Sequence, residues 1–225
     1  MKQIPLPLPH TSSMGADDFL KTDSNRDAFS WIEKWPDWPS HGLIITGLSG
    51  SGKTHLLNLW LAKSSGHLVT AQSLIGSDTA LLTATTLCIA IDNIDQLAGK
   101  SEAEEKLFHL YNHLKTAKGF LLLTMQQGAG QTGFHLPDLR SRLLALPAVN
   151  LGPPDDDLLA ALLVKQFRDR QISIDIGVVD YLSARTARDA ASIRDLVEKL
   201  DHASLAQGRK ISIALARKVL EESDD

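Results

Sequence analysis

The residues from Gly47 to Thr54 have the types and spacing of a phosphate-binding loop, because G-L-S-G-S-G-K-T fits the pattern G-x-x-x-x-G-K-[ST]. Glycines allow backbone N–H groups to turn toward a β-phosphate, while Lys53 adds a positive charge and the Thr54 hydroxyl can hold Mg²⁺. The sequence therefore predicts a site for ATP or ADP with Mg²⁺. The expected nucleotide contacts are Ser49, Gly50, Ser51, Gly52, Lys53, Thr54 and His55.

A second polar group follows the apolar run 86–91. Asp92 ends this run, and a carboxylate there can hold Mg²⁺ through water. The next position, where many ATPases of this type have a second carboxylate, is Asn93, and an amide cannot act as a general base. We therefore expect slow ATP turnover. Asp95 could substitute only if a turn redirected it, and otherwise it caps a helix.

Thr124 follows the apolar run 120–123. A hydroxyl at the carboxyl end of a strand beside the phosphate loop can sense the γ-phosphate or the attacking water, which gives it a catalytic role. The alternative, a threonine that merely ends a strand, stays open at this stage.

These groups need a scaffold that brings the ends of strands together. In the first two thirds of the chain, the apolar runs alternate with segments whose apolar residues have helical spacing. The clearest of these segments is 101–117. Alternating strands and helices predict a parallel sheet in an αβα arrangement. The expected strands lie at 41–46, 67–71, 86–91, 120–124 and within 147–154.

Beyond Pro153 the pattern changes to helices alone. We therefore expect an α/β fold in three parts, namely a flexible tail over 1–12, an αβα nucleotide-binding base over 13–152 and a small all-helical lid over 153–225. The helices expected in the lid are 155–170, 176–183, 188–207 and 212–222.

Composition narrows the class of protein. The 225 residues carry 23 basic and 27 acidic side chains, which give a net charge of −4. This charge does not favour binding of the whole protein to DNA, so any DNA contact is expected to be indirect. The single cysteine, Cys88, excludes a disulfide framework. No segment has the length and hydropathy of a membrane span or a signal peptide, which predicts a cytoplasmic protein.

The amino-terminal residues 3–9 alternate proline with aliphatic side chains. This pattern forbids a helix and favours an extended conformation that suits docking into the groove of another protein. A disordered leader is the alternative. The residues expected to contact such a partner are Gln3, Ile4, Leu6 and Leu8.

Together, the loop followed by His55, the strand 89–94, the segment 139–143 and the helical end resemble the AAA+ module of the bacterial DnaA/Hda family. The resemblance covers roughly 14–225 and is expected to lack the initiator's DNA-binding helix-turn-helix domain. Residues 3–8 are similar to the sliding-clamp-binding motif of the Hda branch. The resemblance implies a clamp-tethered protein whose partners are DnaA and the β sliding clamp of DNA polymerase III.

The resemblance also implies roles for individual residues. Asn25, with Leu20 nearby, matches the segment that contacts adenine in the family, and Arg142 matches the arginine finger, a catalytic group supplied in trans. An ion pair between Arg142 and Asp138, four residues earlier on a helix, is the alternative. For the lid arginine that touches the phosphates, two candidates flank the expected position. They are Arg188 and Arg194.

The expected function is that of a nucleotide-bound adaptor that binds the clamp, stimulates ATP hydrolysis by DnaA and so limits replication initiation, with at most weak ATPase activity of its own. Self-association of the chain is a further option. One alternative is an autonomous P-loop ATPase resembling a helicase loader, or a small-molecule kinase. A DNA binder of the initiator type is disfavoured by the acidic balance of the chain.

Overall fold

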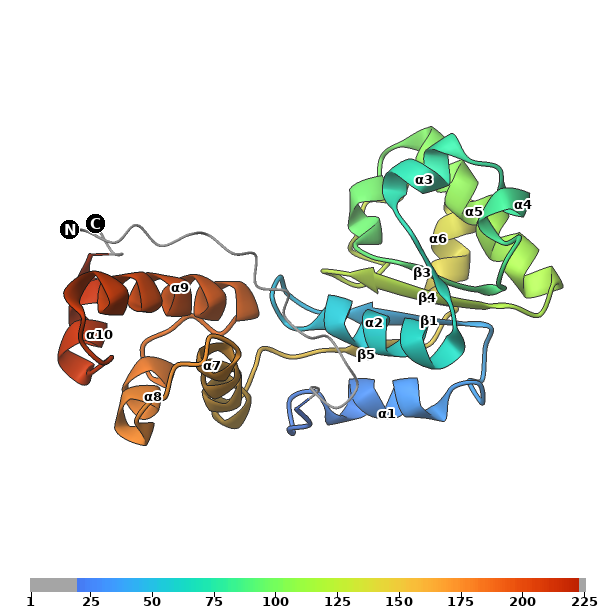
Figure 1. Cartoon of the computed structure of the whole chain (residues 1–225). Helices are drawn as coiled ribbons and strands as arrows, with labels where there is room; N and C mark the ends of the chain where they lie inside the picture. The colour runs from blue at the N-terminus through green and yellow to red at the C-terminus, as the bar shows by residue number, and fades with distance from the viewer. Residues whose placement is uncertain (1–19, 223–225) are drawn as a thin grey trace. The chain divides into compact units, whose positions relative to one another are not determined.

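The computed structural model describes residues 20–222 (Figure 1). The chain forms two compact units and passes from one to the other between Gly152 and Pro153. We call the unit before this point the base and the unit after it the lid.

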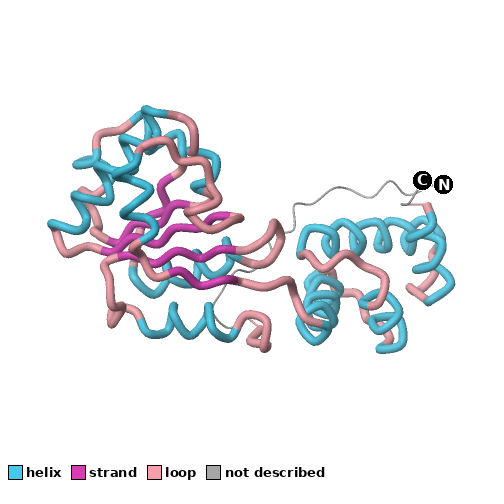
Figure 2. Tube along the Cα trace, turned by 180° about the vertical axis from the view of Figure 1, so that it is seen from behind, coloured by secondary structure: helices cyan, strands magenta, loops and turns pink. Residues whose placement is uncertain are grey.

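The base is built on a five-stranded parallel sheet (Figure 2), which confirms the predicted fold class. The strand order is β2-β3-β4-β1-β5, so β4 separates β1 from β3. Since parallel strands all end at the same edge, the segments that follow β1, β3 and β4 come together there. The strands are β1 (Gly42–Thr46), β2 (His67–Val69), β3 (Cys88–Ile91), β4 (Phe120–Met125) and β5 (Ala148–Asn150).

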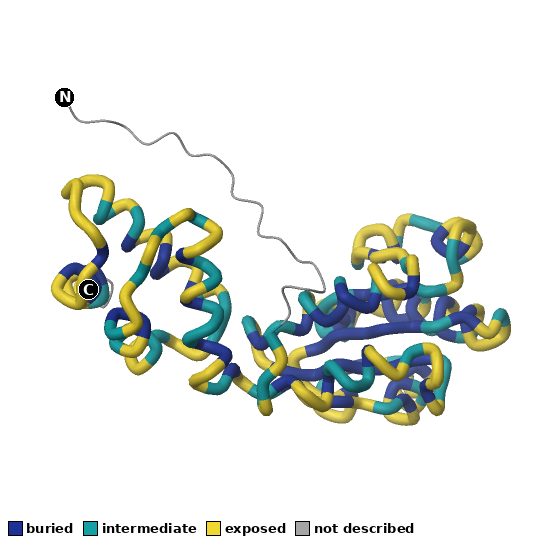
Figure 3. Tube along the Cα trace, turned by 60° about the horizontal axis from the view of Figure 1, so that its bottom comes forward, coloured by how far each residue is buried: buried dark blue, intermediate teal, exposed yellow. Residues whose placement is uncertain are grey.

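Helices cover both faces of the sheet. Successive strand residues point to opposite faces, so Leu43 and Ile45 pack under α1 and α2, whereas Ile44 belongs to the core on the other face. Both cores are buried along the strands (Figure 3). The helices are α1 (Arg26–Lys34) and α2 (Lys53–Ser64) on the first face, and α3 (Ala71–Gly76), α4 (Thr79–Leu82), α5 (Ser101–Thr116) and α6 (Pro137–Leu144) on the second.

An aromatic cluster fixes α1 and α2 to the first face of the sheet. Trp38 stacks on Trp60 with ring centroids 5.8 Å apart, and Trp35 meets Trp60 edge to face at 6.2 Å. Phe120 of β4 lies edge-on to both Trp35 and Trp38. Because Trp60 is fully buried in the helix that leaves the phosphate loop, this packing holds that helix against the sheet.

The lid has its own apolar core, which includes Leu163, Phe167, Leu182, Val197 and Leu200. Each of its helices begins at a side chain that accepts a hydrogen bond from the backbone of the first turn, which defines where the helix starts. The helices are α7 (Asp156–Asp169), α8 (Ile176–Ser183), α9 (Ala190–Gln207) and α10 (Ile213–Glu221), capped by Asp155, Asp175, Asp189 and Ser212. Over residues 20–222, no helix combines the length and apolarity needed to cross a membrane.

Candidate functional site

The phosphate loop connects β1 to α2 at the carboxyl edge of the sheet. Gly50 and Gly52 have φ angles of 73° and 102°, a region that glycine enters without strain. A β-carbon at Gly47 would lie 2.5 Å from the backbone oxygen of Leu151. The loop therefore follows a path that its glycines make accessible, and it runs directly beside the end of β5.

Lys53 lies inside this loop with 6% of its surface exposed. Its Nζ donates hydrogen bonds to the carbonyl oxygens of Gly47 (2.7 Å) and Leu48 (2.9 Å). Burial lowers the pKa of the Lys53 ammonium group, while the carboxylates of Asp92 and Asp95 act in the opposite direction. The charge of Lys53 is thus held within the loop, where a phosphate would bind.

Asp92 is the centre of a hydrogen-bonded group at the ends of three elements. The Thr54 hydroxyl donates to its Oδ2 over 2.8 Å, and the Thr124 hydroxyl donates to its Oδ1. The backbone N–H of Asn93 in turn donates to Thr124 Oγ1 over 2.8 Å. The structure therefore brings together the two residues predicted to hold Mg²⁺, Thr54 and Asp92, and places the predicted Thr124 between them and Asn93. These oxygen donors suit a hard divalent cation.

Asn93 and Asp95 lie in a tight turn after β3. Asn93 has a φ of 54°, a left-handed conformation that asparagine and aspartate tolerate better than most residues. A 3₁₀ turn over Ile94–Leu97 follows, and within it Asp95 Oδ1 accepts a hydrogen bond from the backbone N–H of Gln126 (2.6 Å). The Asp95 carboxylate thus joins the ends of β3 and β4 instead of capping a helix.

The side-chain amide of Asn25 forms hydrogen bonds within the turn that precedes α1. Its Nδ2 donates to the carbonyl of Leu20 (2.8 Å) and its Oδ1 accepts from the backbone N–H of Thr22 (3.0 Å), with only 5% of the residue exposed. This turn lies near the end of β5, since the Ser24 carbonyl is 3.8 Å from a β-carbon built on Gly152. Asn25 therefore shapes the turn that the family resemblance assigns to adenine.

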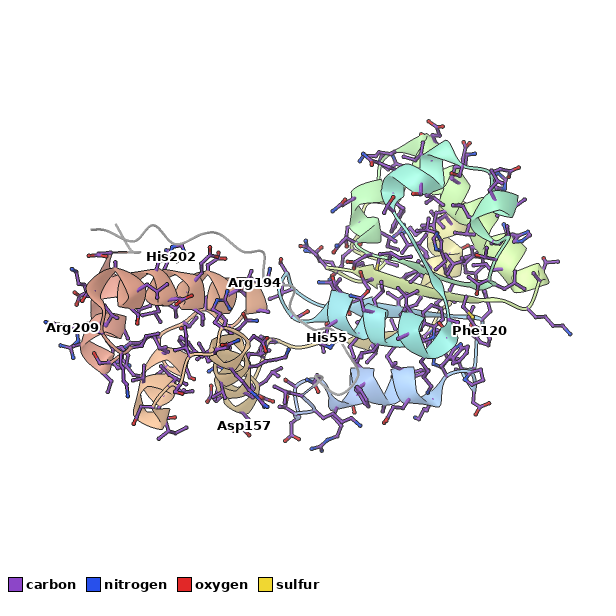
Figure 4. All side chains as sticks on the ribbon, in the orientation of Figure 1. His55, Phe120, Asp157, Arg194, His202 and Arg209 are labelled. Atoms are coloured by element: carbon purple, nitrogen blue, oxygen red, sulfur yellow. The ribbon has the colours of Figure 1, made fainter. Side chains whose placement is uncertain are left out.

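His55 follows the phosphate loop, and its backbone N–H donates to the carbonyl of Gly52 (3.0 Å). Figure 4 labels it near the beginning of α2, with Phe120 at the opposite end of the sheet. The remaining predicted loop residues differ in exposure. Ser49 is exposed, whereas Ser51 is buried and its hydroxyl has no hydrogen-bond partner among the described residues.

Arg142 is half-buried in the last turn of α6. Its guanidinium carbon lies 5.0 Å from the ring centroid of Phe108 and 5.7 Å from that of Tyr111, both on α5. Burial raises the pKa of Tyr111, and the charge of Arg142 lowers it in part. No described residue accepts a hydrogen bond from Arg142 Nε. The guanidinium is therefore held by aromatic contacts instead of by a carboxylate.

The ion pair with Asp138, offered above as an alternative for Arg142, is not present in residues 20–222. Asp138 is exposed, and its backbone oxygen accepts a hydrogen bond from the Ser141 hydroxyl (2.9 Å). Arg140 is also exposed and donates to the carbonyl of Gly130. The two arginines of α6 thus have different surroundings.

The two lid arginines also differ. Arg188 forms an ion pair with Asp156 over 2.5 Å and donates to the carbonyl of Pro154 (3.2 Å). Arg194 is exposed on α9 (Figure 4) and forms no ion pair within the described lid. The predicted clamp contacts Gln3, Ile4, Leu6 and Leu8 lie outside the described residues.

Glu104, which no sequence motif singles out, is fully buried on α5. Its carboxylate accepts hydrogen bonds from the backbone N–H groups of Gly99 (2.7 Å), His135 (2.9 Å) and Leu136 (2.6 Å). Burial alone would raise the pKa of Glu104, but these amides hold the pKa below its usual range. A glutamate among the apolar positions of a helix was the only signal that could have revealed it.

Replacing Gly47 with alanine is expected to distort the phosphate loop. The new methyl group meets a backbone oxygen at 2.5 Å, so the variant is expected to lose roughly 1–3 kcal/mol of unfolding free energy and to bind nucleotide more weakly. Chemical denaturation and nucleotide titration measure these effects. Gly76→Ala is the matched control, because nothing lies within 4 Å of its β-carbon. Equal behaviour of both variants would contradict the described loop path.

Both units are similar in sequence to known proteins. The family model described as "Hda, lid domain" matches residues 155–220. An uncharacterized protein of Haemophilus influenzae is 26% identical over 230 residues, which span 97% of this chain and 98% of that protein. The similarity to the Hda family model is thus confined to the lid, whereas the similarity to the uncharacterized protein extends over nearly the whole chain.

Two solved structures share the fold. Domain III of the replication initiation protein DnaA from Thermotoga maritima has a TM-score of 0.83 and 18% identity, over 96% of this chain and 98% of that domain. AMPPCP-bound DnaA from Aquifex aeolicus has a TM-score of 0.76 and 18% identity, over 96% of this chain and 71% of that protein. The chain thus has the fold of DnaA domain III, and residues 155–220 within its lid match the Hda lid model.

Proposed function

We propose that this AAA+ base with its Hda lid is a clamp-tethered adaptor, which holds an adenine nucleotide and stimulates ATP hydrolysis by DnaA. Such a protein acts in the cytoplasm and limits the initiation of DNA replication. The match of residues 155–220 to the Hda lid carries the proposal, because the structural likeness bears on the fold alone.

The phosphate loop supports the nucleotide part of this proposal. Lys53 is held within the loop, and Thr54 is joined to Asp92, so a diphosphate and Mg²⁺ would meet a site whose charged groups are already in place. Asn93 occupies the position of a general base but cannot take a proton. The adaptor therefore retains ADP or ATP with little turnover, and Arg194 of the lid is the proposed phosphate contact.

Arg142 supports the part that concerns DnaA. No carboxylate of the described residues pairs with it, so internal charge compensation does not explain an arginine at this position. Its charge is available to the γ-phosphate of ATP held by a neighbouring DnaA subunit.

The proposal is tested by measuring ATP hydrolysis by DnaA in the presence of this protein and the sliding clamp. Stimulation that requires both is expected. If the protein alone hydrolysed ATP at several per second, within the ordinary range for enzymes, an autonomous P-loop ATPase or kinase would replace the adaptor.

Deleting residues 1–9 is expected to abolish clamp binding while nucleotide binding and the unfolding midpoint stay unchanged. We propose that Gln3 and the aliphatic side chains of Ile4, Leu6 and Leu8 make the contacts. A titration of the clamp with the full-length and shortened chains measures the difference. Equal affinity of the two chains would remove the clamp from the proposed function.

A further inference from the structure

Glu104 has an arrangement that its place on an amphipathic helix does not explain. Its carboxylate is fully buried, and an ionised carboxylate is costly to bury unless hydrogen bonds compensate it. Three backbone N–H groups do so, from Gly99, His135 and Leu136. All three are supplied by loops, so Glu104 ties two loops to α5.

One of these loops leads directly into the helix of Arg142. Leu136 is the N-cap residue of α6, and its own side chain makes no capping hydrogen bond. Glu104 instead accepts the N–H groups of His135 and Leu136, immediately before Pro137 begins the helix. The amino-terminal end of α6 is thus fixed by a side chain from another helix.

The same stripe of α5 also supports the other end of α6. Glu104, Phe108 and Tyr111 are spaced i, i+4 and i+7, so they lie along one side of α5. Phe108 and Tyr111 hold the Arg142 guanidinium at 5.0 Å and 5.7 Å. One side of α5 therefore contacts both ends of α6, namely the residues just before Pro137 and Arg142 in the last turn.

We infer that Glu104 is a positioning residue, which sets the placement of α6 and through it the point at which Arg142 is presented to the partner's ATP. This inference rests on the proposed function. Positions 136 and 142 are separated by about 9 Å along a helix, so a small tilt at the first displaces the second. A misplacement of about 1 Å in a catalytic arrangement can cost about 10²-fold in rate.

Glu104→Gln tests the inference in the full-length protein. The amide nearly preserves the volume but removes the charge and turns an NH₂ group toward backbone N–H donors. We expect stimulated hydrolysis by DnaA to reach a maximal rate lower by roughly 10- to 100-fold, with unchanged nucleotide affinity and unchanged half-saturating concentration. Hydrogen–deuterium exchange is expected to rise over 135–144 and around Gly99 but not in the sheet. Glu105→Gln, at an exposed neighbour, is the control.

Four outcomes would overturn the inference. Exchange over 135–144 that matches the wild type would show that Glu104 does not fix α6. Exchange that rises throughout the sheet would show a general loss of stability. A full stimulated rate in Glu104→Gln, under conditions where Arg142→Ala loses stimulation, would refute positioning while the proposed function stands. If Arg142→Ala keeps full stimulation, the proposed function itself fails, and the inference fails with it.

Discussion

Replacing Arg142 with alanine is expected to remove nearly all stimulation of ATP hydrolysis by DnaA, a loss of about 10³- to 10⁵-fold in rate. A guanidinium supplied in trans neutralises the negative charge that develops on the transferring phosphoryl group, and alanine cannot do so. The variant is expected to keep nucleotide and clamp binding, and losing the contacts with Phe108 and Tyr111 should cost only about 0.5–1 kcal/mol of unfolding free energy. Single-turnover hydrolysis of ATP bound to DnaA measures the effect.

Two neighbouring variants control for a general disturbance of α6. Arg140→Ala removes a charge from the same helix, but Arg140 is exposed and contacts only the Gly130 carbonyl. Asp138→Ala removes the carboxylate that lies four positions before Arg142 on the helix. Both are expected to retain stimulation. If Arg140→Ala lost as much as Arg142→Ala, the total charge of the helix, and not a specific finger, would be responsible.

Replacing Asn93 with aspartate is expected to raise the protein's own ATP turnover by about 10²-fold, at the lower end of what a positioned general base contributes. Aspartate tolerates the left-handed conformation of this position, where φ is 54°, so the turn after β3 should keep its shape. The new carboxylate would follow Asp92 directly and could take a proton from the attacking water. Steady-state hydrolysis by the isolated protein is the measurement.

A double variant shows whether the gained activity belongs to this site. Adding Lys53→Ala to Asn93→Asp is expected to remove it, because Lys53 is held within the phosphate loop by Gly47 and Leu48. If Asn93→Asp turns over ATP no faster than the wild type, another group must activate the water. Thr124, whose hydroxyl oxygen accepts a hydrogen bond from the Asn93 N–H, is then the nearest candidate.

The elements of the base could be predicted because their signals are local. Apolar runs mark the strands, glycine spacing marks the loop, and Pro153 marks the change to helices. The order of parallel strands is not local, since each crossover can place the next strand at several positions. The sequence therefore did not show that β4 lies between β1 and β3, which is what allows Thr124 to meet Asp92.

The details of the site depend on contacts between distant segments, which the pattern does not contain. Asp95 meets Gln126 from another strand end, and Glu104 meets amides more than thirty positions away as well as the nearby Gly99. For Arg142, the local rule of helical spacing pointed to Asp138, but the aromatic side of α5 provides the contact. Tertiary packing thus decides the partners of charged groups that local spacing only suggests.

The aromatic cluster under the sheet gives the base an optical signal of its own. All four tryptophans, Trp31, Trp35, Trp38 and Trp60, belong to the base, and the stacked pair Trp38 and Trp60 includes a residue of the helix that leaves the phosphate loop. Tryptophan fluorescence therefore reports the unfolding of the base alone, whereas far-ultraviolet circular dichroism reports the loss of helices in both the base and the lid. Melting curves recorded by the two methods coincide only if base and lid unfold as one cooperative unit.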